Sequence, residues 1–328
     1  MSKVALINAS AVQRHLFTED VIRQVENTWR WYGEGTIEMP AKITLNMESQ
    51  GIDSWMNSMP SYIKATDYVG IKWVGGFAES RAAGKPYIRA SVFLADSHMG
   101  DLRAVFAGDR ISDMRTGAQA AIMSKYLAAK TEIVTLIGAG VQGYWCLECM
   151  SKILDIKEAR ICDINPAARE RMIKRFEGYP FGLIDSPDNS SGCVGSDIII
   201  TVTTANVPLI GKKDVKPGAL VLTMGSFAEA TDELLLGADR KITDSIAQAV
   251  HRGSYAHLAE KGLVDESSFD ADISSVIVGK AKGRMSEDEI IVAPIIGMGA
   301  TDAAVAAMLL EKLERDYPDE VFYFDING

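Results

Sequence analysis

The sequence has few of the features that mark nucleic-acid-binding or membrane-spanning proteins. Its 34 lysines and arginines are outnumbered by 44 acidic residues, and the formal net charge of −10 argues against nucleic acid as a partner. No apolar stretch approaches the roughly 20 residues that span a bilayer. No basic segment leads into a long apolar run at the start of the sequence, so we expect no signal peptide and no membrane partner.

Cysteine is also scarce, and its spacing does not complete a metal site. Cys146 and Cys149 have the Cys-x-x-Cys spacing, but no second pair of cysteines or histidines follows them. We therefore expect two reduced thiols on a helix, no bound metal, and a cytoplasmic location. The 328 residues are 47% hydrophobic and 24% charged, which is typical of an ordinary globular protein with about two domains.

The first part of the chain predicts a mixed α+β domain. Residues 15–34 carry apolar side chains at helical spacing and end at two glycines. Short strands are predicted at 43–47, 68–73 and 87–95, and an alanine-rich helix at 113–130. A last helix, 301–315, is expected to pack back on this domain.

The second part predicts a doubly wound parallel sheet. Predicted strands at 133–137, 159–162, 197–201, 220–224, 241–243 and 290–293 are interleaved with helical segments, notably up to 154 and at 167–176. This alternation indicates βαβ units and an α/β, Rossmann-type fold. We expect a smaller mixed domain at 1–115 plus 301–328 and a Rossmann domain at 116–300, with the cleft between them as the default site.

A glycine-rich loop follows the first strand of the second part. It reads Gly138-Ala139-Gly140-Val141-Gln142-Gly143 and opens a helix, as a dinucleotide-binding loop does. Gly138 would permit the tight turn, Gly140 would let the backbone approach the pyrophosphate, and Gly143 would allow close helix–strand packing. The helix N-terminus would offer N–H groups to the phosphates. The sequence therefore predicts a nicotinamide dinucleotide site.

Asp163 ends the next strand, twenty residues beyond Gly143. Its carboxylate would accept hydrogen bonds from the adenosine ribose hydroxyls and would repel a 2′-phosphate. No arginine follows it immediately, since Arg169 lies six residues on. We therefore expect NAD as cofactor rather than NADP.

The chain resembles the ornithine cyclodeaminase/mu-crystallin family over nearly its whole length. The matching segments are residues 39–42 (Met-Pro-Ala-Lys), 59–60 (Met-Pro), 70–73 (Gly-Ile-Lys-Trp), 114–118 (Met-Arg-Thr-Gly-Ala), the glycine loop, 201–204 (Thr-Val-Thr-Thr) and 297–302 (Gly-Met-Gly-Ala-Thr-Asp). That family includes ornithine cyclodeaminases, an archaeal type of alanine dehydrogenase, ketimine reductases and N-substituted amino-acid dehydrogenases. The resemblance implies a homodimer joined through the non-Rossmann domain.

The resemblance also implies site residues. Lys42 and Arg115 would hold the substrate carboxylate, and Lys72 would bind substrate and act near the reacting nitrogen. Arg115 and Thr116 would touch the cofactor's pyrophosphate. The expected cofactor-binding set is completed by Thr203, Thr204, Met224, Gly225, Ser226 and Met298.

Several candidate residues also have a purely structural interpretation: Lys42 could point to solvent, and Arg115 could be a surface arginine that pairs with Asp113. Lys72, in an apolar strand, either points to solvent by alternation or belongs to a site. Asp302, at the start of the last helix, is either a helix N-cap or a catalytic residue that positions the substrate amine.

Two departures from the family pattern bear on the reaction. Ornithine cyclodeaminases carry an acidic residue where this chain has Asn57 and an aspartate where it has Phe227. Without these acids, ring closure and water activation lose their obvious agent, unless an alignment slip brings Glu229 or Asp232 into play. We therefore expect an NAD-dependent oxidoreductase acting on the C–N bond of a small amino or imino acid. Ornithine cyclodeaminase is the first alternative, and a non-catalytic cofactor-binding protein resembling mu-crystallin is the second.

Overall fold

The computed structural model describes residues 3–326 and divides into two compact units. Unit 1 comprises the residues up to Arg115 together with those from Met298 onward, and unit 2 is Thr116–Gly297. Both chain crossings fall beside predicted motif residues, one between Arg115 and Thr116 and the other between Gly297 and Met298.

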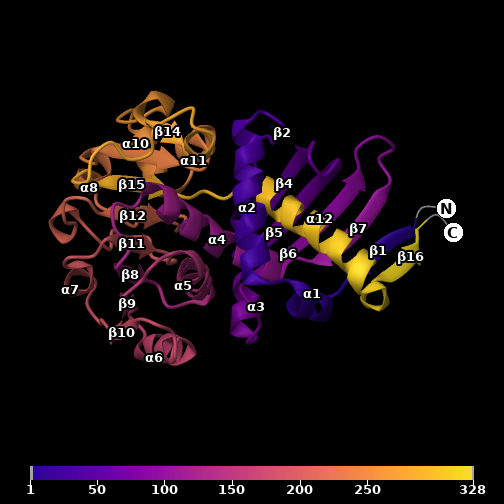
Figure 1. Cartoon of the computed structure of the whole chain (residues 1–328), viewed down its shortest axis with the longest axis horizontal. Coiled ribbons are helices and arrows are strands. Elements are labelled where there is room, and N and C mark those ends of the chain that lie inside the picture. Colours follow the sequence, from indigo (N-terminus) through magenta and orange to yellow (C-terminus); the bar gives the residue numbers. More distant parts are fainter. Residues whose placement is uncertain (1–2, 327–328) are drawn as a thin grey trace. The chain divides into compact units, whose positions relative to one another are not determined.

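Unit 1 is built on a mostly antiparallel sheet in which eight described strands take part (Figure 1). The strands are β1 (Lys3–Ile7), β2 (Ile37–Glu38), β3 (Ile43–Asn46), β4 (Ser54–Ile63), β5 (Tyr68–Phe77), β6 (Ile88–Asp96), β7 (Leu102–Ala107) and β16 (Phe322–Asp325). Their order is β16-β1-β7-β6-β5-β4-β2, and β3 pairs with β4. The helices of this unit are α1 (Ala9–His15), α2 (Thr18–Gly33), α3 (Ala78–Ala82) and α12 (Gly299–Asp316).

Helix α12 forms the core of unit 1. It packs on β4, β5 and β6 and against α2, and Figure 1 shows it as the yellow helix beside the indigo one. A Cβ built on Gly70 of β5 would lie 2.4 Å from the Cβ of Ala303, so a glycine is required for this close approach. The face of β5 that carries Gly70 is therefore the face that α12 covers.

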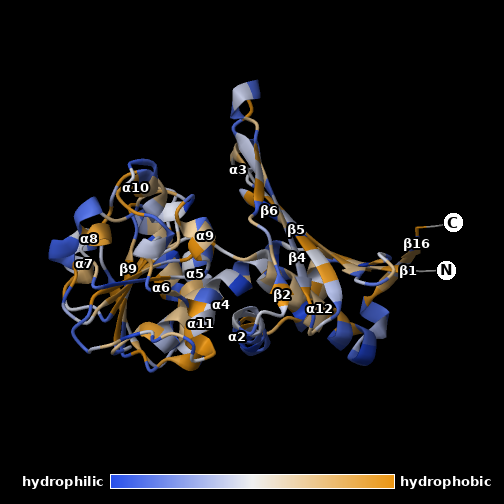
Figure 2. Cartoon of the chain, turned by 90° about the horizontal axis from the view of Figure 1, so that it is seen from above, coloured by the Kyte–Doolittle hydropathy of each residue, from blue (hydrophilic) through white to orange (hydrophobic). Residues whose placement is uncertain are grey.

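Figure 2 shows hydrophobic residues along the strands of unit 1. It also shows α3, the short helix that connects β5 to β6. Apolar side chains of unit 1 also remain exposed on β3 and β5, where Ile43 and Trp73 are 70% and 48% exposed. Strand β4 contains Pro60, which has no backbone N–H. Along the edge of β4 that pairs with β2 and β3, Pro60 lies between the two paired stretches, so the missing N–H breaks no hydrogen bond there.

Unit 2 contains an all-parallel sheet of eight described strands, ordered β10-β9-β8-β11-β12-β15-β13-β14. The strands are β8 (Ile133–Ile137), β9 (Glu158–Cys162), β10 (Gly182–Asp185), β11 (Ile198–Thr201), β12 (Leu220–Thr223), β13 (Arg240–Thr243), β14 (Ala271–Asp272) and β15 (Ile291–Pro294). The helices are α5 (Val141–Ile153), α6 (Pro166–Arg175), α7 (Asn189–Cys193), α8 (Asp232–Leu236), α9 (Ile246–Ala249), α10 (Ala256–Glu260) and α11 (Ile273–Ile277), while α4 (Asp109–Leu127) begins in unit 1. The order around β8 is that of a Rossmann fold, with its topological switch point between β8 and β11.

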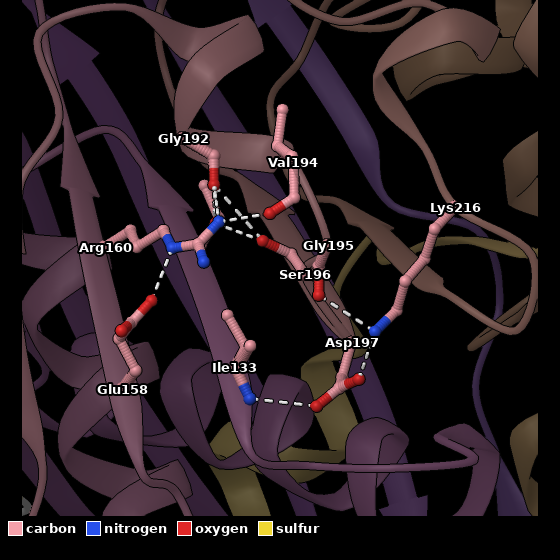
Figure 3. A network of polar contacts seen from close by, with 10 residues as sticks. Ile133, Glu158, Arg160, Gly192, Val194, Gly195, Ser196, Asp197 and Lys216 are labelled. Carbon is pink, nitrogen blue, oxygen red and sulfur yellow. Dashed lines mark hydrogen bonds and ion pairs between the residues drawn. The ribbon is translucent and has the colours of Figure 1, made fainter.

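A polar network fixes the amino ends of β8 and β11 (Figure 3). Asp197, just before β11, accepts hydrogen bonds from the Ile133 amide at 2.9 Å and from Lys216 Nζ at 2.6 Å. Arg160 of β9 donates to the carbonyl oxygens of Gly192 and Val194, beyond which the chain enters β11. This network lies at the opposite end of the sheet from the glycine loop, because the strands are parallel.

The predicted fold class, a Rossmann-type doubly wound sheet plus a mixed α+β domain, is confirmed. The predicted strand 133–137 matches β8, whereas the predicted helix at 15–34 begins only at Thr18 because Leu16 and Phe17 are extended. Within the described part of the chain, no helix has the length and apolar character needed to cross a bilayer.

Candidate functional site

Three charged residues of unit 1 form a buried cluster. Lys72 of β5 lies with Nζ 3.0 Å from Oδ2 of Asp302, and Arg115 of α4 lies with Nε 3.1 Å from Oδ1 of the same carboxylate. Lys72 is 1% exposed, Arg115 7% and Asp302 fully buried. Sequence reasoning picked these three residues separately, and the fold brings them together around one carboxylate.

The local structure explains the position of Lys72. Residues alternate along a strand, and Gly70, Lys72 and Val74 of β5 are all buried while Val69 and Trp73 are exposed. Lys72 therefore lies on the face that α12 covers. The hypothesis that this lysine points to solvent is wrong.

The structural interpretation of Asp302 as an N-cap is also wrong. The N-cap of α12 is Met298, and Asp302 lies a full turn inside the helix, where its side chain reaches the two cations. The Trp29 indole N–H lies 3.2 Å from the sulfur of Met298, which is itself fully buried.

Burial sets the charge state of the cluster. It lowers the pKa of Lys72 to about 8; the positive charge of Arg115 acts in the same direction, and Asp302 opposes both. Burial also raises the pKa of Asp113 to about 6, with the neighbouring carboxylate of Asp109 adding to the shift. A lysine with a pKa near 8 can gain and lose a proton close to neutral pH, as a general acid or base must.

Ser112 belongs to the same cluster and was not predicted. Lys72 Nζ donates a hydrogen bond to Ser112 Oγ at 3.3 Å. Ser112 precedes Arg115 by three residues on α4, which places both side chains on one face of the helix. That spacing is the signal that could have identified it.

Lys42 lies partly buried in the segment just before β3. Ile43 pairs with Ser58 in antiparallel register, and Met59 pairs with Lys72 on the next strand. Lys42 comes one residue before this ladder, and Met59, which pairs with Lys72, comes one residue after Ser58. Asn57, at the position of the missing acid, is buried and accepts a hydrogen bond from Thr44 Oγ1 at 2.6 Å.

The glycine loop of unit 2 has the geometry expected of a phosphate-binding loop. Gly138 has φ +113°, which side chains rarely adopt, and a Cβ at Gly143 would lie 2.0 Å from the carbonyl oxygen of Gly138. At Gly140, in contrast, a Cβ would have no atom within 4 Å. Gly140 is the N-cap of α5 and makes no side-chain cap hydrogen bond, so the helix begins at a residue with empty space around its Cα.

Asp163 lies against this loop. Its Oδ2 accepts a hydrogen bond from the Ala139 amide at 2.8 Å, and its Oδ1 accepts one from the Asn165 amide at 2.8 Å. Arg169 donates to the carbonyl oxygen of Asp163 at 2.7 Å and forms an ion pair with Asp185. The first arginine after Asp163 in the sequence is thus already paired with a carboxylate.

The segments after β11 and β12 meet at Glu229. This fully buried carboxylate accepts hydrogen bonds from Thr201, Thr203 and Gly225. Phe227, which the family resemblance matches to the cyclodeaminase aspartate, is 51% exposed.

Asp232 is also engaged. It lies 2.6 Å from Nε2 of His257 and 3.5 Å from Nζ of Lys261, and the hydrogen bond from His257 helps to lower its pKa.

The remaining predicted cofactor residues of unit 2 lie on α4 or in the segments that follow β11 and β12. Thr204 and Ser226 are exposed, whereas Met224 is partly buried and lies with its sulfur 3.6 Å from that of Cys146. Thr116 is partly buried on α4, one residue before Gly117. A Cβ on Gly117 would lie 2.2 Å from the carbonyl oxygen of Trp145, so the glycine of the Met-Arg-Thr-Gly-Ala motif lets α4 approach α5.

The cysteines of unit 2 are buried free thiols. Burial raises the pKa of Cys146 to about 12, which makes this thiol unreactive near neutral pH. Among residues 3–326, no group of three or more histidines, cysteines or acidic residues is arranged to hold a metal ion.

The fold is that of a dinucleotide-binding enzyme, and unit 1 holds a buried cluster of two cations around one carboxylate. The model of the ornithine cyclodeaminase/mu-crystallin family matches residues 2–316, and the chain belongs to this family. The resemblance inferred from the sequence motifs is thereby confirmed.

Individual relatives are similar over nearly the whole chain. An alanine dehydrogenase of Archaeoglobus fulgidus is 27% identical over 328 residues, which cover 98% of this chain and 99% of the relative. A structure of an archaeal alanine dehydrogenase dimer with bound NAD has a TM-score of 0.92 at 25% identity and covers 99% of each chain. The Δ1-pyrroline-2-carboxylate reductase of Thermococcus litoralis, in complex with NADH and L-proline, has a TM-score of 0.89 at 25% identity, covering 95% of this chain and 98% of that one.

Proposed function

We propose that this protein is an NAD-dependent oxidoreductase acting on the C–N bond of a small amino or imino acid. In the oxidative direction an amino acid gives an imino acid, which water hydrolyses to a 2-oxo acid and ammonia. In the reductive direction an imine or ketimine gives the amine. The observation that carries the proposal is the buried cluster of Lys72, Arg115 and Asp302, together with the glycine loop of the same chain.

The residues of unit 2 fit a nicotinamide dinucleotide. The open space at Gly140 and the uncapped first turn of α5 suit a pyrophosphate. The carboxylate of Asp163, at the end of β9, suits the ribose hydroxyls and disfavours a 2′-phosphate. When bound, the nicotinamide accepts a hydride from Cα of the amino acid or returns it to an imine.

The residues of unit 1 have separate tasks in this proposal. Arg115 holds the substrate carboxylate through its planar guanidinium, and Lys42 adds a second positive charge. Lys72 takes a proton from the substrate nitrogen in the oxidative direction and donates it in reverse, because its pKa of about 8 allows both states. Asp302 keeps both cations in place and supplies the negative charge that compensates them.

The two acids that could restore cyclodeaminase chemistry are already engaged. Glu229 accepts four hydrogen bonds in the interior of unit 2, and Asp232 pairs with His257 and Lys261. These contacts favour net oxidoreduction over the internal recycling of NAD that ornithine cyclodeaminase requires.

A panel assay tests the proposal. The purified protein is incubated with NAD and single amino acids, and separately with NADH, ammonia or methylamine and single 2-oxo acids, while NADH absorbance is followed. We expect net NADH formation or consumption with at least one small substrate. Proline released from ornithine without net NADH change would instead identify a cyclodeaminase, and NADH binding without turnover on any substrate would identify a binding protein.

A homodimer and a cytoplasmic location are part of the same proposal. Ile43 and Leu45 of β3 are 70% and 61% exposed, and apolar surface of this kind is typical of protein interfaces. An alanine dehydrogenase similar to this chain is a dimer, which supports a dimer here, and the exposed apolar side chains of β3 favour joining through the sheet of unit 1. Light scattering of the protein and of Leu45→Asp tests this, since a charge in the interface should shift the mass toward the monomer.

A further inference from the structure

We propose that Glu229 is a positioning residue for the dinucleotide, whose buried carboxylate holds the ends of β11 and β12 in the shape that the cofactor needs. This inference rests on the proposed function, since it names a residue that shapes the proposed cofactor site. Glu229 is fully buried and lies in the segment between β12 and α8.

Four hydrogen bonds converge on this carboxylate from two neighbouring strand ends. Oε1 accepts from the amide and the hydroxyl of Thr203, both at 2.7 Å. Oε2 accepts from Thr201 Oγ1 at 2.9 Å and from the amide of Gly225 at 2.7 Å. Thr201 is the last residue of β11, Thr203 follows that strand, and Gly225 follows β12. One side chain therefore connects the ends of both strands.

The residue at position 225 has to be a glycine for this arrangement. A Cβ built on Gly225 would lie 2.4 Å from the carboxyl carbon of Glu229 and within 2.7 Å of both oxygens. The carboxylate of Glu229 therefore occupies the space that a side chain at Gly225 would need.

The segment that Glu229 holds is in contact with the phosphate loop. A Cβ on Gly138 would lie 2.6 Å from the carbonyl oxygen of Val202 and 3.2 Å from Cγ2 of Thr203. Strand β11 is the neighbour of β8 across the topological switch point, where dinucleotides bind at the carboxyl ends of parallel strands. Thr203 therefore lies beside the first glycine of the loop, and we expect a shift of Thr203 to disturb that glycine.

Removing this carboxylate also lowers stability, because buried N–H groups lose their acceptor. NADH binding by a Glu229 variant must therefore be compared with NADH binding by a control variant that loses a similar buried carboxylate. Asp197 is a matched residue: it is a buried carboxylate that accepts the Ile133 amide and Lys216, and it ties β11 to β8 (Figure 3). It acts at the amino ends of β11 and β8, at the opposite end of the parallel sheet from the glycine loop.

The experiment compares Glu229→Gln with Asp197→Asn in the full-length protein. NADH affinity is measured by fluorescence titration, amino-acid KM and kcat by NADH absorbance, and stability by thermal unfolding. The side-chain amide introduced by Glu229→Gln would turn an N–H toward amide and hydroxyl donors. We therefore expect the Kd for NADH to rise at least about tenfold, with the amino-acid KM at saturating cofactor within about twofold. Asp197→Asn should lose comparable stability and keep its Kd within about twofold.

Each outcome decides one of the two proposals. If the unchanged protein does not bind NADH, the proposed function fails before the variants are compared. If it binds and Glu229→Gln binds equally well, or Asp197→Asn weakens binding as much, the positioning role is overturned. If Glu229→Gln does not fold, Thr201→Val decides instead, because it removes the bond from Oγ1 to Glu229 at 2.9 Å and a long contact with the Leu222 carbonyl at 3.5 Å, and leaves the other three bonds to the carboxylate in place. A rise in Kd in that variant supports the role, and an unchanged Kd overturns it.

Discussion

Asp302 and Lys72 form an ion pair of 3.0 Å in which both side chains are withdrawn from water. The second oxygen of the same carboxylate lies 3.1 Å from Arg115 Nε, so one anion holds two cations from different elements. Buried charges are tolerated when they are paired, and removing one partner of such a pair costs about 3–5 kcal/mol. Each of the three side chains therefore depends on the other two, and in the proposed function the substrate carboxylate would enter a site whose cations are already held in place.

The first prediction concerns pH. Burial lowers the pKa of Lys72 from 10.5 to about 8, so Lys72 is protonated below this pH and neutral above it. Amino-acid oxidation needs the neutral amine as proton acceptor, and kcat/KM for oxidation should rise about tenfold per pH unit below pH 8 and level off above it. Imine reduction needs the ammonium and should fall above pH 8. Both profiles follow from initial rates at saturating cofactor.

The Asp302→Asn variant is the control for that prediction. Asp302 raises the pKa of Lys72 against the effect of burial, and the neutral amide removes this contribution. The midpoint of the oxidation profile should therefore move to lower pH, while the maximal rate falls because Lys72 and Arg115 are less firmly held. A midpoint that stays near pH 8 in Asp302→Asn, or in Lys72→Met, would show that another group controls the profile.

The second prediction concerns cofactor choice. Asp163→Asn keeps the size of the side chain but removes the charge that repels a 2′-phosphate. NADH should bind about tenfold more weakly, which corresponds to about 1.4 kcal/mol, and NADPH should lose less or gain. Fluorescence titrations with both nucleotides measure the change. Tighter binding of NADPH than NADH by the unchanged protein would contradict the assignment of NAD.

The sequence was most informative where the structure depends on neighbouring residues. Strand 133–137, the glycine loop and the following helix form one continuous segment, and their pattern predicted β8, the loop and α5. Strand β4 was not predicted, because it carries polar residues and Pro60, and its position depends on pairing with β5.

The role of Asp302 could not be read from the sequence either. Its position at the start of a helix suits an N-cap equally well, and its partner Lys72 is distant in the chain. Glu229 is a similar case. Its acidity was visible as a possible catalytic acid, but the four donors that surround it come from three separate positions and appear only in the folded chain.

The third prediction concerns the paired cysteines. Cys146→Ala with Cys149→Ala should leave kcat and KM unchanged, because both thiols are buried and burial raises the pKa of Cys146 to about 12. Loss of two buried sulfur atoms should lower the free energy of unfolding by about 1–3 kcal/mol in total. Urea unfolding and zinc analysis measure the two effects. A stoichiometric zinc that disappears in the double variant would overturn the interpretation as structural thiols.

The fourth prediction separates two glycines of the phosphate loop. At Gly140 an added methyl group meets no atom within 4 Å, and φ −86° is allowed for alanine, so Gly140→Ala should fold with nearly unchanged stability. The methyl group would, however, occupy the space proposed for the pyrophosphate. The Kd for NADH should therefore rise at least about tenfold in this variant.

Gly143→Ala should mainly lower stability, whereas Gly140→Ala should mainly weaken NADH binding. A Cβ at Gly143 would lie 2.0 Å from the carbonyl oxygen of Gly138, so the start of α5 has to move away from β8, at a cost of several kcal/mol. Thermal unfolding should show a clear loss of stability in Gly143→Ala and little in Gly140→Ala, while NADH binding is weakened in both. If Gly140→Ala binds NADH as well as the unchanged protein does, the pyrophosphate does not approach the backbone at this residue. The loop would then be a structural turn, because only its packing at Gly143 would matter.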